Sequence, residues 1–71
     1  MTALPNLTAK KLLAILQHHK FEQVRQKGSH VILRHADGRR TTVPVHAGKT
    51  IGKGLLRKIM HDTDLTVEDL L

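Results

Sequence analysis

Residues 29–45 read SHVILRHADGRRTTVPV, and this stretch decides the fold. Runs containing apolar and β-branched residues lie on either side of Ala36-Asp37-Gly38, a sequence typical of a tight turn. We therefore predict one strand over residues 29–35 and a returning strand over residues 39–45, joined as an antiparallel hairpin.

The length of the turn decides which residues of this hairpin are buried. A two-residue turn would pair Ile32 with Val43, whereas a three-residue loop closed by a left-handed glycine pairs Val31 with Val43 and Leu33 with Thr41. We favour the second register, because it gathers the apolar residues on one face that can be covered. The other face then carries Ile32 among polar and basic side chains: His30, Arg34, Arg40 and Thr42.

Helical and strand patterns precede the hairpin. A helix is expected to begin after Thr8, with Asn6 as the competing N-cap, and to end near residues 18–20. Its apolar stripe has helical spacing: Leu12, Leu13, Ile15 and Leu16. A short strand over residues 21–26 follows, with two apolar anchors, Phe21 and Val24.

After the hairpin we predict a second helix over about residues 53–61 and a last short helix through Leu71. Gly52 and Gly54, near the start of the second helix, are expected to let another backbone or a phosphate come close. Thr66 and Asp69 have the spacing of a capping box at the start of the last helix. The order predicts a single α+β domain over residues 1–71, with a three-stranded antiparallel sheet and helices packed on one face.

The charge balance favours an anionic partner. The 71 residues include 12 Lys and Arg against 6 Asp and Glu, for a formal net charge of +6. Between Lys10 and Lys58 only Glu22 and Asp37 oppose the positive charge. Nucleic acid is the first expectation and a membrane surface the second.

The composition indicates how a nucleic acid would be recognised and where in the cell the protein is expected. Phe21 is the only aromatic residue, so recognition of a nucleic acid by backbone and shape is expected rather than base stacking. The chain has no cysteine and no apolar run approaching the roughly 20 residues of a membrane helix. We therefore expect a cytoplasmic protein without disulfides and without a membrane partner.

Gly28-Ser29-His30 stands at the start of the first hairpin strand, directly after a basic stretch. Histidine exchanges protons near neutral pH, so this placement suggests proton-transfer chemistry on a phosphate-containing polymer. The six histidines are scattered and no cysteine joins them, so neither a metal site nor a cofactor is expected. Of the others, His35 and His61 are expected to be solvated.

Four short motifs occur in the order found in one family: Gln26-Lys27-Gly28-Ser29-His30, Asp37-Gly38-Arg39-Arg40, Val43-Pro44-Val45-His46 and Gly54-Leu55-Leu56-Arg57-Lys58-Ile59. Together they make the chain, from about Leu7 to Leu71, resemble HicA-like toxins. Two positions depart from many relatives: Lys20 replaces a glycine, and Leu55 replaces a threonine at the start of the second helix.

The resemblance implies a double-stranded-RNA-binding-like fold. It also implies a metal-independent and ribosome-independent endoribonuclease that cleaves mRNA and stops translation. A HicB-like antitoxin would neutralise it by covering the active surface. The catalytic histidine of the family matches His30. Neither of the two differences from the family, at Lys20 and Leu55, changes this residue.

On this reading His30 acts as general base, or as general acid in the reverse assignment, and Lys27 and Arg40 bind the phosphate. Gly28 lets the protein backbone approach the phosphate, and Ser29 positions that phosphate through a hydrogen bond. Three further residues are expected to assist: Arg34 and Lys53 as RNA-binding support, and His46 as candidate second acid or base.

Two other classes of function stay open on the sequence. One is a catalytically silent RNA-binding module that uses the same surface, with His30 as an ordinary surface histidine. The other is an adaptor whose basic surface meets an acidic protein, which would have no affinity for RNA.

Overall fold

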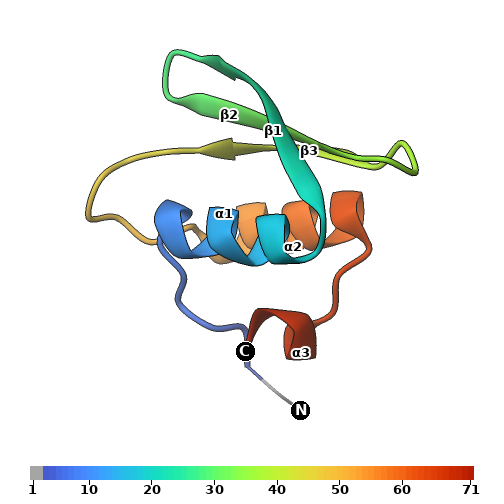
Figure 1. Ribbon diagram of the computed structural model, residues 1–71. Coiled ribbons are helices and arrows are strands. Elements are labelled where there is room, and N and C mark those ends of the chain that lie inside the picture. The colour runs from blue at the N-terminus through green and yellow to red at the C-terminus, as the bar shows by residue number, and fades with distance from the viewer. Residues whose placement is uncertain (1–2) are drawn as a thin grey trace.

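The computed structural model describes residues 3–71 and contains six elements in the expected order. They are α1 (Ala9–His18), β1 (Phe21–Lys27), β2 (His30–His35), β3 (Arg40–Pro44), α2 (Lys53–Thr63) and α3 (Val67–Leu70). Figure 1 shows the sheet as one layer, with α1 and α2 forming a second layer on one side of it and α3 beyond them. The predicted α+β fold is therefore confirmed.

The three-residue register of the β2–β3 hairpin is also confirmed. The sheet has the order β1-β2-β3, and Val31 lies opposite Val43 while Leu33 lies opposite Thr41. All four side chains are buried. Gly38 has φ +99°, the left-handed conformation that the loop requires of its last residue.

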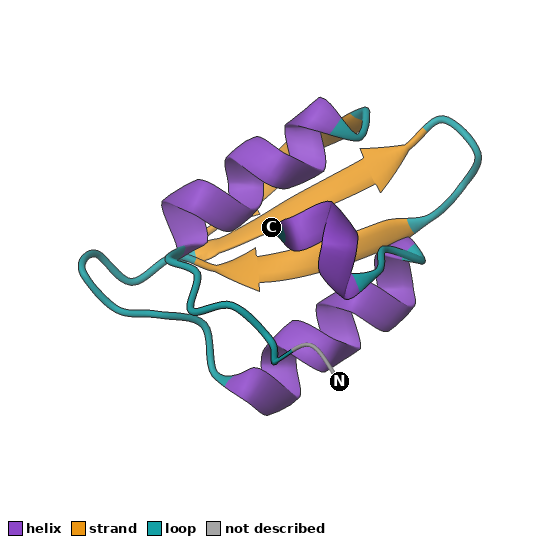
Figure 2. Ribbon diagram, turned by 90° about the horizontal axis from the view of Figure 1, so that it is seen from below, coloured by secondary structure: helices purple, strands orange, loops and turns teal. Residues whose placement is uncertain are grey.

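Figure 2, seen from the helix side, shows α1 and α2 lying in front of the sheet. Apolar side chains from both helices pack with those of the sheet in one core. Thr8 begins α1 as predicted, since its hydroxyl accepts a hydrogen bond from the backbone N–H of Lys11 (3.3 Å). The helices contribute most of the fully buried residues that meet the sheet: Leu12, Leu16, Leu56 and Ile59. The capping box predicted for α3 is present between Thr66 and Asp69.

The prediction that Val24 anchors β1 in the core is wrong. Val24 is 54% exposed. It lies three residues after the buried Phe21, so the two-residue period of a strand already turns its side chain away from the core. A β-bulge lies between Gln23 and Arg25. The bulge inserts one extra residue into the strand and changes which side chains beyond it face the core. Phe21, at the other end of the same strand, is buried as expected.

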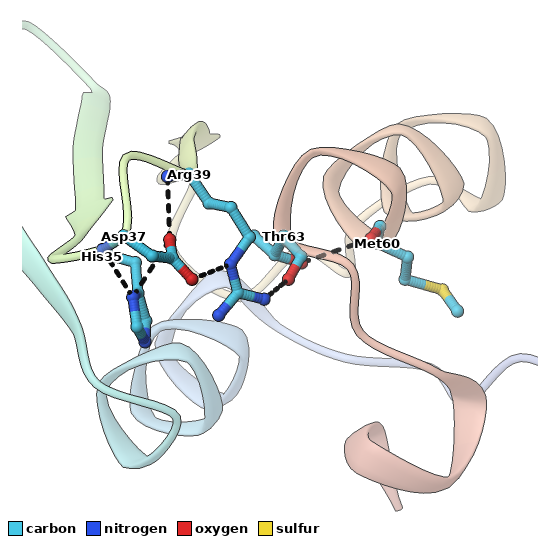
Figure 3. A network of polar contacts seen from close by, with 5 residues as sticks. All are labelled: His35, Asp37, Arg39, Met60 and Thr63. Carbon is cyan, nitrogen blue, oxygen red and sulfur yellow. Dashed lines mark hydrogen bonds and ion pairs between the residues drawn. The ribbon is translucent and has the colours of Figure 1, made fainter.

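His35 was expected to be solvated, and this is also wrong. Its side chain is only 19% exposed, because the ring packs edge-on against Phe21 with a centroid separation of 5.1 Å. Nδ1 of His35 lies 3.1 Å from the backbone nitrogen of Asp37, and the Asp37 carboxylate bonds to the Arg39 side chain at 2.8 Å. The Arg39 guanidinium in turn donates to the backbone carbonyl of Thr63 (Figure 3). This network fastens the β2–β3 loop to the end of α2.

This network predicts that the thermal stability of the fold depends on pH. The hydrogen bond from the Arg39 backbone N–H, reinforced by the Arg39 side chain, lowers the pKa of Asp37 below its ordinary value of 3.8. A carboxyl whose pKa is lower in the folded chain stabilises the fold above the unfolded pKa and loses that contribution as pH falls through the folded pKa. Asp37→Asn is therefore expected to lower Tm at pH 7, with the difference from wild type shrinking below pH 3.8.

Thermal unfolding followed by circular dichroism between pH 2 and pH 7 measures this difference. Asp64→Asn is the matched control, because Asp64 is exposed and asparagine tolerates its left-handed backbone. A Tm difference for Asp37→Asn that stays constant over the whole pH range would contradict the assignment.

Candidate nucleic-acid interface

His30 is the first residue of β2 and follows a two-residue turn. Gly28, the first turn residue, has φ +60°, while Ser29 has no positive φ. A glycine in this conformation at the first position is the pattern of a type II′ turn, which suits the twist of a hairpin. The turn brings His30 opposite Lys27 on one side and Pro44 on the other.

The sheet face opposite α1 and α2, here called the open face, carries the candidate residues. Residues paired directly across neighbouring strands project to the same side of a sheet, so the register identifies this face. Its members come from all three strands: Glu22, Arg25, Lys27, His30, Ile32, Arg34, Arg40, Thr42 and Pro44. His30 and the four cations among them are exposed.

The open face is strongly basic. Arg25, Lys27, Arg34 and Arg40 oppose a single carboxylate, that of Glu22. Within residues 3–71 none of these four cations forms an ion pair; the ion pairs lie in the β2–β3 loop and along α2. The cations are therefore available to bind phosphate groups without first breaking an internal contact.

Arg25 is the member of the open face that the sequence did not reveal as a candidate. Strict alternation along β1 from the buried Phe21 would turn both Arg25 and Lys27 toward the helices. Only the bulge at Val24 brings them onto the open face. No turn residue or glycine in residues 21–26 signals that bulge.

His46 lies at the same end of the sheet as His30, because the backbone N–H of Val45 donates to the carbonyl of Ser29 (2.6 Å). Its surroundings are different, however. His46 lines a groove of about 750 Å³ beside α1 and a smaller one of about 280 Å³ at the start of α2. The groove beside α1 has a mostly apolar lining that includes Ala9, Leu13, Ala14, Val45 and Ala47.

Lys53 is engaged within the chain. Its ammonium group donates to the carbonyls of Leu4 (2.7 Å) and Pro5 (3.2 Å) and to the side chain of Asn6 (2.9 Å). These bonds use all three of its donors. Lys53 therefore ties the segment before α1 to the start of α2, and we do not assign it to RNA.

The glycines at the start of α2 are not required by the fold. A Cβ atom built on Gly52 or Gly54 would meet no other atom within 4 Å, and neither residue has a positive φ. That they let a phosphate come close stays a prediction.

A family model described as "HicA toxin of bacterial toxin-antitoxin" matches residues 9–65. This span contains the whole sheet, α1 and α2, with His30 and every cation of the open face. The chain belongs to the HicA toxin family. It is thus a toxin of a toxin–antitoxin system, and membership implies an antitoxin as its partner.

No curated protein matches the HicA-family chain. HicA toxins are generally of the ribonuclease type, which agrees with a basic open face around a histidine. Over residues 3–71 of this HicA toxin, no three His, Asp or Glu side chains are grouped so as to hold a metal ion. Over the same residues, none of its helices has the length and apolar character to cross a membrane.

Proposed function

We propose that this HicA-family toxin is a metal-independent endoribonuclease that cleaves mRNA in the cytoplasm and inhibits translation. A HicB-like antitoxin would neutralise it. The observation that supports this proposal most strongly is the exposed His30 at the tip of a hairpin, directly opposite Lys27 and on the same sheet face as three further cations, none of which has an ion pair within residues 3–71.

RNA carries its own nucleophile, the ribose 2′-hydroxyl. In the proposed step the 2′-oxygen attacks the neighbouring phosphorus while a base removes its proton. The bond from phosphorus to the 5′-oxygen of the next nucleotide breaks, and an acid protonates that oxygen. The products are a 2′,3′-cyclic phosphate and a 5′-hydroxyl.

His30 supplies one of the two proton transfers. Lys27 lies directly opposite it on β1, so it can offset the charge that develops on the phosphate. Arg40 is on the same face of β3 but opposite Arg34, about 13 Å along the sheet from His30, so it binds a neighbouring phosphate of the RNA. Ser29 offers a hydroxyl beside His30, and Arg34 extends the basic surface along β2. His46 is the candidate for the second proton transfer, since the bond between Val45 and Ser29 holds its backbone near the hairpin tip.

The experiment is incubation of the purified protein with a structured mRNA in excess EDTA, followed by analysis of the fragment ends. Cyclic-phosphate and 5′-hydroxyl ends are expected. Fragments with 5′-phosphate ends that appear only when a divalent metal is added would overturn the proposal. Binding of the RNA without cleavage would favour the alternative of a non-catalytic RNA-binding module.

A further inference from the structure

The β-bulge at Val24 changes which side chains of β1 face the core and which lie on the open face. Before the bulge, Phe21 lies on the core face opposite His35. After it, Arg25 lies opposite Ile32 and Lys27 lies opposite His30, both on the open face. A single strand therefore packs its first residue into the core and presents two cations beside the candidate catalytic histidine.

Arg25 and Lys27 form a row along β1. Two residues on one face of a strand are about 6.6 Å apart, which is comparable to the spacing of successive phosphates in an extended RNA strand. Arg25 is exposed and has no ion pair within residues 3–71. The next residue of β1 paired on this face, Glu22, is negative and would repel a further phosphate.

We propose that Arg25 is a substrate-positioning residue that binds the phosphate next to the scissile one. This inference rests on the proposed ribonuclease function. Lys27 and His30 contact the scissile phosphodiester, and the Arg25 guanidinium forms paired hydrogen bonds to the adjacent phosphate. The substrate is thus a polynucleotide held by at least two consecutive phosphates, and because phosphates carry no base identity, the contribution of Arg25 is the same for any sequence.

The test uses an oligonucleotide with one unmodified ribose among 2′-O-methyl riboses, so that only one phosphodiester can be cleaved. Two further versions carry a neutral methylphosphonate in place of the phosphate on the 5′ or the 3′ side of that bond. Wild-type protein, Arg25→Gln, Arg25→Lys and the control Arg57→Gln are compared. Arg57 is an exposed arginine on α2, away from the open face.

Arg25→Gln is expected to reduce kcat/KM on the all-phosphate oligonucleotide roughly 10- to 100-fold, the effect of losing the paired hydrogen bonds between charged groups. Arg25→Lys recovers part of the loss, because lysine keeps the positive charge but not the paired hydrogen bonds. Arg57→Gln keeps all of the activity. For wild type, one of the two neutral linkages causes a similar loss, and that linkage causes no further loss in Arg25→Gln. Independent losses that multiply, or equal activity of Arg25→Gln and Arg57→Gln, would overturn the inference.

Failure of the proposed function gives a different result. If wild-type protein leaves the all-phosphate oligonucleotide intact, the ribonuclease proposal is wrong. The same comparison is then made with dissociation constants, and the coupling between Arg25 and the neutral linkage decides whether Arg25 binds that phosphate. Equal Kd values for wild type and Arg25→Gln would overturn the inference in that case as well.

Discussion

His30→Ala is expected to lower the rate of RNA cleavage by about 10²- to 10⁴-fold, the usual contribution of a general acid or base. Tm should not change, because His30 is exposed on the open face. Affinity for RNA should change little, since the four cations of that face remain. Single-turnover cleavage of a labelled RNA in EDTA, with Kd and Tm of the same samples, measures all three quantities.

His61→Ala is the matched control for this result. His61 is an exposed histidine on α2, distant in the fold from the hairpin tip, and its loss should leave cleavage unchanged. Wild-type activity in His30→Ala would remove His30 from the mechanism. His46→Ala tests the second histidine separately. A loss of cleavage rate comparable to that of His30→Ala supports His46 as the group for the second proton transfer. Full activity would leave His46 as a residue that only lines the two grooves.

Phe21→Ala is expected to lower the free energy of unfolding by a large fraction of its total. Phe21 is 1% exposed, and it also packs against the His35 ring and below the Arg39 guanidinium. Loss of a buried phenylalanine costs about 3–5 kcal/mol. A chain of this length has a stability of about 4–11 kcal/mol, so the substitution removes a large part of it.

Urea unfolding followed by circular dichroism measures this loss. Val24→Ala is the control on the same strand, because Val24 is exposed, and it should change the free energy of unfolding by less than about 0.5 kcal/mol. Phe21→Leu, which retains an apolar side chain, should be much milder than Phe21→Ala. A cost below about 1 kcal/mol for Phe21→Ala would show that Phe21 does not anchor β1.

The fold was accessible from the sequence because its local signals agree with one another. Thr8 and Thr66 cap their helices as predicted, and Gly38 adopts the left-handed conformation that specifies the three-residue loop. That loop sets the register of β2 and β3, and the register places His30, Arg34 and Arg40 on one face. These candidate residues were predictable because period-two alternation holds throughout β2 and β3.

Alternation fails in β1, and there the sequence was insufficient. The position of a bulge depends on how a strand pairs with its neighbour, and residues 21–27 contain no local feature that specifies it. As a result Arg25 was missed. Val24 was assigned to the core for its apolar character alone, although the two-residue period from Phe21 places it on the opposite face. The roles of His35 and Lys53 were missed for a related reason, since their contacts are made with residues that folding brings together: Phe21 for His35 and the segment before α1 for Lys53.

The sequence by itself determined the order of helices and strands, the β2–β3 register, the net positive charge and the motif around His30, because these depend on residues close together in the chain. Only the tertiary structure decided that Arg25 and Lys27 join His30 on the open face, and that Lys53 and His35 are engaged within the chain. Those outcomes depend on pairing and packing between distant segments, whose geometry no local pattern of residues encodes.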